Sequence, residues 1–124
     1  MKYLLDSNAV IALVQNDSAA LVGRAATCDE GDLVTSAIVY AEVAYGSSRD
    51  KPPAVEQLRA LVEEVPVLPF DQAAASVYAG LPFRRGGYDR LIAAHALSLG
   101  LTLVTDNVAD FADVPGLRVE TWTA

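Results

Sequence analysis

Short apolar runs alternate with longer segments of helical periodicity along most of the chain. The runs are rich in Leu and β-branched residues, which is typical of buried strands, whereas the segments between them repeat apolar positions every three to four residues. The pattern predicts strands at residues 3–5, 33–35, 101–104 and 117–122. Residues 65–70 are either an edge strand or an irregular segment, because Pro66 and Pro69 interrupt them.

Helices are predicted between the strands, and residues that commonly begin or end helices mark several of their ends. Ser36 and Asp71 are suited to cap helix N-termini, the pair Pro52-Pro53 opens a first turn, and Gly100 stops a helix. The expected helices run through 10–14, 19–28, 36 to about 46, 52–62, 72–79 and 88–99. Alternation of strands and helices predicts an α/β sandwich around a mostly parallel sheet.

The length and composition indicate one ordinary globular domain covering residues 1–124. The 124 residues are 52% hydrophobic and 20% charged, which is enough apolar content for a packed core. No apolar run approaches the roughly 18–20 residues needed to cross a bilayer. The single cysteine, Cys28, forms neither a disulfide framework nor a zinc cluster. We therefore expect a cytoplasmic protein with no membrane partner.

The chain carries a formal net charge of −7, from 16 acidic against 9 basic residues. A general nucleic-acid binder usually has a basic surface, so this charge argues against that class. It is compatible with a nuclease, because an enzyme that holds divalent cations must concentrate carboxylates. The position of the acids decides between these interpretations.

Two acidic positions directly follow predicted strands. Asp6 follows residues 3–5, and Asp106 with Asn107 follows residues 101–104 after Thr105. The carboxyl ends of parallel strands lie at one edge of a sheet, where ligands bind in such folds. Asp after a strand is also a common turn or capping residue, so each position alone has a purely structural explanation.

Two further acids interrupt apolar helix faces. Glu42 lies between Ile38 and Tyr45 on one face, and Asp89 lies in a first helical turn before Ile92. A carboxylate on a buried face is costly unless it is paired or binds a metal, and Arg49 is the possible partner near Glu42 in sequence. Together the four acids predict a pocket that holds a cation, and oxygen ligands favour Mg²⁺ or Mn²⁺ over zinc.

The motifs around these acids resemble those of PIN-domain ribonucleases, and of VapC-type toxins in particular. LLDSNAVIAL resembles the opening of the family, SAIVYAEVAYG its second motif, and YDRLIAAHALSLGLTLVTDNVADFADVPGLRVETW the carboxyl-terminal third. FDQAAASVYA is similar as well, and residues 46–64 are the least distinctive part. The resemblance covers nearly the whole chain.

This resemblance implies a three-layer α/β/α fold, one or two Mg²⁺ or Mn²⁺ ions, and hydrolysis of RNA phosphodiester bonds. It also implies a homodimer and a cognate VapB-type antitoxin. Asp6, Glu42 and Asp89 match the first three acids of the family, and Asp106 is taken as the fourth metal ligand. The family motif itself falls on Asn107, which Asp106 and Asp110 flank.

The remaining candidate residues surround this pocket. Ser7, Thr105, Asn107 and Asp110 are candidates for contacts to ligands or phosphate. Arg84 and Arg85, in the short loop GLPFRRGG, either contact phosphates or form an exposed basic turn. His95 and Cys28 are interpreted as structural residues.

Other functional classes fit the residues less well. A receiver-like phosphoacceptor needs a lysine after a late strand, and the lysines are Lys2 and Lys51. A haloacid-type phosphatase needs Asp-x-Asp after the first strand, where this chain has Asn8. The stronger alternative is a catalytically weak or inactive PIN-like module that binds antitoxin or RNA.

Overall fold

A parallel sheet forms the centre of the protein, as shown by a computed structural model that describes residues 1–82 and 87–123. Within the described residues the sheet has five strands in the order β3-β2-β1-β4-β5, and every neighbouring pair is parallel. The strands are β1 (Tyr3–Leu5), β2 (Leu33–Ser36), β3 (Val67–Leu68), β4 (Thr102–Val104) and β5 (Val119–Glu120). The sheet is therefore all parallel rather than mostly parallel.

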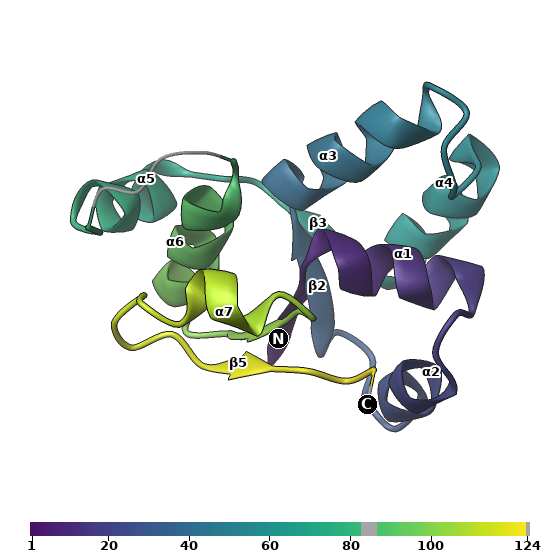
Figure 1. Cartoon of the computed structure of the whole chain (residues 1–124), viewed down its shortest axis with the longest axis horizontal. Coiled ribbons are helices and arrows are strands. Elements are labelled where there is room, and N and C mark those ends of the chain that lie inside the picture. Colours follow the sequence, from purple (N-terminus) through teal and green to yellow (C-terminus); the bar gives the residue numbers. More distant parts are fainter. Residues whose placement is uncertain (83–86, 124) are drawn as a thin grey trace.

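Helices cover both faces of the sheet and complete a three-layer α/β/α sandwich (Figure 1). They are α1 (Ser7–Gln15), α2 (Ala19–Ala26), α3 (Ala37–Ser47), α4 (Val55–Glu64), α5 (Gln72–Ala79), α6 (Asp89–Leu99) and α7 (Val108–Phe111). Helices α1, α2 and α4 lie on one side, and α5, α6 and α7 lie on the other (Figure 1). Helix α3 continues from the end of β2 and packs against α1, α4 and α6.

The predicted helix ends rest on identifiable residues. Ser36 and Asp71 cap α3 and α5 through their side-chain oxygens, as expected. Gly100 ends α6 with φ of 67°, a conformation that glycine adopts without steric cost. The prediction for Pro52-Pro53 was wrong, because α4 begins at Val55 and the two prolines precede it.

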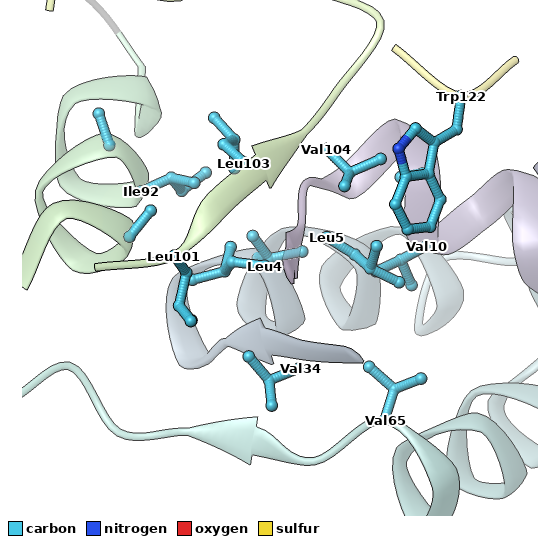
Figure 2. Close-up of a cluster of buried hydrophobic side chains, with 14 of the residues drawn as sticks. Leu4, Leu5, Val10, Val34, Val65, Ile92, Leu101, Leu103, Val104 and Trp122 are labelled. Carbon is cyan, nitrogen blue, oxygen red and sulfur yellow. The ribbon is translucent and has the colours of Figure 1, made fainter. Parts of the chain in front are cut away.

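The core fills both faces of the central strands, which explains why these strands are apolar without alternation. Leu4 and Leu103 are paired in register and face Ile92 of α6 (Figure 2). The next pair, Leu5 and Val104, lies on the other side of the sheet. This packing fixes the ends of β1 and β4 next to each other.

Three further findings concern particular elements. Strand β3 is an edge strand of two residues, which settles the alternative for residues 65–70. Helix α7 was not predicted, because four residues carry too little periodicity to be recognised. Among the described residues, no helix combines the length and the apolar character needed to cross a membrane.

Candidate active site

Asp6 lies at the carboxyl end of the central strand β1 and is almost completely buried, with 3% of its surface exposed. Its backbone N–H donates to Val104 O at 2.9 Å, so the ladder between β1 and β4 continues through it. Its carboxylate accepts from Ser7 N at 2.8 Å, which caps α1, and from Thr105 Oγ1 at 2.7 Å. Burial raises the pKa of Asp6, the two hydrogen bonds oppose that shift, and repulsion from Asp110 adds to it.

A network of hydrogen bonds fixes this carboxylate from the side of β4. The buried Thr105 hydroxyl donates to Asp6 and accepts from Asn8 Nδ2 and from Asn107 N, both at 3.1 Å. Asn8 in turn accepts from the backbone N–H of Asp106 at 3.0 Å. Thr105 therefore orients Asp6, its predicted contact to ligands or phosphate stays a prediction, and the part played by Asn8 was missed. Its position two residues after Asp6 was the available signal.

Glu42 reaches the same edge of the sheet from α3 and is half-buried. Ser7 Oγ donates to its carboxylate at 3.1 Å, so Ser7 bridges the two acids through its backbone and its side chain. Burial raises the pKa of Glu42, and repulsion from Asp6 and Asp89 raises it further, while the Ser7 hydrogen bond lowers it. Asp6 and Asp89 thus both lie within electrostatic reach of Glu42, and the joint binding of a cation by these acids stays a prediction.

The surroundings of Glu42 differ from the expected ones. Val39 and Val43 form the buried side of α3, whereas Tyr45 is 62% exposed. Glu42 therefore lies at the border of the buried side and not along a stripe that includes Tyr45. Arg49 does not pair with Glu42; its guanidinium lies 3.5 Å from the centre of the Tyr45 ring and donates to Tyr45 O.

Asp106 and Asp110 are the two acids available for the fourth position, and their surroundings differ. Asp110 acts electrostatically on Asp6, whereas the Asp106 carboxylate accepts a hydrogen bond from Thr123 Oγ1 at 2.6 Å on the exposed surface. Asn107 is the exposed residue before α7, and its backbone N–H is bound to Thr105. The assignment of Asp106 as the fourth ligand stays a prediction, and the electrostatic effect of Asp110 on Asp6 makes Asp110 the other candidate.

The donor set suits a hard divalent cation that keeps part of its water shell. Within residues 1–82 and 87–123, no three His, Cys, Asp or Glu side chains are placed so that they could together hold a metal ion. Mg²⁺ is usually bound through one or two carboxylates plus waters and substrate phosphates, so a closed cage is not required. Carboxylates whose pKa values are raised by burial, with mutual repulsion added, fit a site for such a cation. Arg84 and Arg85 lie outside the described residues.

Two residues interpreted as structural are built into the fold. His95 is 1% exposed, its Nδ1 lies 2.8 Å from Ser36 Oγ, and its ring packs edge-on against Phe70. Cys28 is half-buried, and burial raises the pKa of its thiol, which is the opposite of the shift that activates a nucleophilic cysteine. Neither residue belongs to the acidic cluster.

Comparison with known proteins gives full-length relatives. The chain is 31% identical to the tRNA(fMet)-specific endonuclease VapC of Shigella flexneri, with 99% of each protein covered. It is 33% identical to Ribonuclease VapC1 of Haemophilus influenzae strain R2866, again over 99% of each. These matches extend beyond the motifs to the whole chain.

Solved structures agree with this result. The chain matches VapBC2 from Rickettsia felis, bound to a DNA fragment from the promoter, with a TM-score of 0.87 and 26% identity over 98% of this chain and 99% of that one. It matches VapBC-1 from nontypeable Haemophilus influenzae with a TM-score of 0.81 and 33% identity over the full length of both. The sequence model of the PIN domain covers residues 3–117. The fold, the acidic edge of the sheet and these matches show that the chain belongs to the PIN domain family.

Proposed function

We propose that this protein is an endoribonuclease that requires Mg²⁺ or Mn²⁺ and is the toxin of a toxin–antitoxin pair. The observation that carries the proposal is the buried Asp6 at the carboxyl end of β1, joined to Glu42 through Ser7. Asp110 acts electrostatically on Asp6, and Asp89 acts electrostatically on Glu42. The relatives named as a tRNA endonuclease and a ribonuclease support the same activity. The particular RNA that is cut is not part of the proposal.

Each residue of the cluster has a defined task in this proposal. Asp6, with one neighbouring acid of the cluster and with water, would hold the cation. When bound, the cation would supply a water of lowered pKa and neutralise charge on the scissile phosphate. The Thr105 hydroxyl and Ser7 N–H hold the Asp6 carboxylate in one orientation before substrate arrives. Pre-organised carboxylates of this kind need little rearrangement during the reaction.

The experiment compares acids inside and outside the cluster. Asp6→Asn and Asp89→Asn should each abolish Mn²⁺-dependent cleavage of a labelled RNA, while Asp106→Asn should cleave at close to the wild-type rate. Circular dichroism melting checks that all three variants are folded. Retained cleavage by both Asp6→Asn and Asp89→Asn would refute the proposal.

The alternative of a catalytically inactive module was based on the amide at Asn107. Asp110 acts electrostatically on Asp6 and would supply the acid that the amide lacks, which supports an active enzyme. Titration calorimetry discriminates between the two. An active site should bind Mn²⁺ and lose that binding in Asp6→Asn, whereas an inactive module should not bind Mn²⁺.

A VapB-type antitoxin is the protein partner in this proposal, since the matched solved structures include VapBC complexes. A groove lined by α2, α4 and the segment that leads into β2 offers a surface for it. Its floor is apolar and its rim is acidic; the floor includes Leu13, Val22, Leu33, Leu61 and Val65, and the rim Asp29, Glu30, Glu63 and Glu64. An amphipathic helix with basic flanks complements both features.

This docking surface is tested with a variant that leaves the acidic cluster intact. Replacing both Glu63 and Glu64 by Lys should weaken binding of the protein encoded by the adjacent reading frame, with RNA cleavage unchanged. Unchanged binding would place the antitoxin elsewhere. The homodimer and the cytoplasmic location stay predictions, and light scattering of the purified protein tests the former.

A further inference from the structure

Arg90 directly follows Asp89 on α6, and its side chain is buried, with 6% of its surface exposed. Its Nη2 forms an ion pair with the Asp113 carboxylate at 2.5 Å, and Asp113 is about half exposed. Nε and Nη1 are buried without a hydrogen-bond partner among the described residues. One ion pair seldom offsets the cost of removing a guanidinium from water. Stability alone therefore does not explain this residue.

The ion pair connects the two elements that carry the outer acids of the site. Arg90 is in the first turn of α6 beside Asp89, and Asp113 follows α7, the helix that carries Asp110. Helices α6 and α7 lie together on the same side of the sheet (Figure 1). The pair thus joins the start of one helix to the end of the other.

Helix α7 needs such an anchor because it has four residues. A helix of this length is not stable by itself and takes its position from tertiary contacts. Phe111 and Val114 fix it in the core, with 2% and 5% exposed. Apolar contacts are not directional, whereas the charged contact between Arg90 and Asp113 is directional and links α7 to the first turn of α6.

We propose that Arg90 is a positioning residue that, through Asp113, sets the spacing between the Asp89 and Asp110 carboxylates. This inference rests on the proposed function, in which both acids belong to one cation site. Repulsion between two carboxylates at one site would favour separation of the helices that carry them, and the Arg90–Asp113 pair would oppose it. Loss of the Arg90–Asp113 ion pair should weaken cation binding while the protein stays folded.

The test measures Mn²⁺ affinity by titration calorimetry, and kcat with KM for a labelled RNA. Arg90→Met, which leaves no buried charge, and Asp113→Asn should each weaken Mn²⁺ binding about 10-fold, the effect typical of residues that orient metal ligands. Both should lower kcat more than they raise KM. The double variant Arg90→Met/Asp113→Asn should bind Mn²⁺ no more weakly than the single variant with the lower affinity. Arg90→Lys, which keeps the positive charge, should bind Mn²⁺ with most of the wild-type affinity.

A matched control is the exposed pair of Arg24 and Glu120, whose nitrogen and oxygen lie 3.2 Å apart. Arg24→Met should leave Mn²⁺ affinity unchanged. Melting curves separate positioning from folding, because a purely structural role predicts a lower Tm with normal affinity in the folded protein. If Arg90→Met does not fold, the half-exposed Asp113→Asn carries the test.

Failure of this inference is distinguishable from failure of the proposed function. Mn²⁺ affinity within twofold of wild type in both Arg90→Met and Asp113→Asn would overturn the positioning role. The same titration on Asp6→Asn tests the site itself. If Asp6→Asn loses binding while the Arg90 and Asp113 variants keep it, the positioning role alone is wrong.

Discussion

Thr105→Val removes one hydroxyl from the centre of the site and changes the volume of the side chain little. Thr105 is 1% exposed, and its Oγ1 donates to Asp6 Oδ2 at 2.7 Å. The same oxygen accepts from Asn8 Nδ2 and Asn107 N. The substitution therefore removes the donor to a buried carboxylate and an acceptor for two N–H groups.

The expected loss follows from the charge of the acceptor. A hydrogen bond to a charged group contributes about 1.5–3 kcal/mol, against about 1 kcal/mol for a neutral pair. Asn107 is exposed and can bind water, and Asn8 Nδ2 keeps a long contact of 3.5 Å to Asp6. We expect Thr105→Val to lower the free energy of unfolding by about 2–3 kcal/mol at pH 7 without metal.

The loss should depend on pH. The Thr105 hydroxyl lowers the pKa of Asp6, so its removal raises that pKa further. A group with a raised folded-state pKa contributes stability that is present at low pH and is lost as pH rises through the folded value. The difference between wild type and variant should therefore be largest at neutral pH and shrink to about 1 kcal/mol once Asp6 is protonated.

Urea denaturation in EDTA at several pH values measures both quantities. Thr35→Val is the matched control, because Thr35 is equally buried but donates to the neutral Leu5 carbonyl at 2.8 Å. It should cost about 1 kcal/mol at every pH. Equal losses for the two variants, or no change with pH for Thr105→Val, would refute the role assigned to the charged hydrogen bond.

Two further predictions concern charge and packing. Burial and mutual repulsion raise the pKa values of Asp6 and Glu42, so the metal-free protein should lose stability as pH rises through those values, and Glu42→Gln should lose less. Identical pH profiles in urea denaturation would contradict this. Trp122 is 3% exposed, 4.8 Å from the Tyr3 ring, and 4.7 Å from the Arg24 guanidinium carbon. Trp122→Ala should cost about 3–5 kcal/mol, and a loss below about 1 kcal/mol in urea denaturation would contradict its place in the core.

Much of the site follows from sequence because the rule that governs it is topological. Parallel strands end at one edge, so the positions of Asp6 and Thr105 follow once the strands are located. Glu42 and Asp89 were found because acids on apolar helices need an explanation. These arguments require only the order of elements and their periodicity.

The fourth acid could not be predicted in the same way. Asp106 directly follows β4 and has the position that the rule selects, yet its carboxylate binds Thr123 at the surface. Asp110 lies near Asp6 because Phe111 inserts into the core and orients a helix of four residues. That orientation is a tertiary effect, and so short a segment carries no periodic signal for it.

The backbone N–H of Asp6 donates to Val104 O at 2.9 Å, within the ladder between β1 and β4. Asp110 lies on α7, which is a single helical turn. Exposing the Asp6 amide requires separation of β1 from β4, which is close to global unfolding, whereas α7 with Asp110 can unfold locally. Asp6 and Asp110 therefore differ in the local stability of the backbone that carries them. Ligands or substitutions that remove activity without unfolding the protein should therefore act at α7 and Asp110 and not at Asp6.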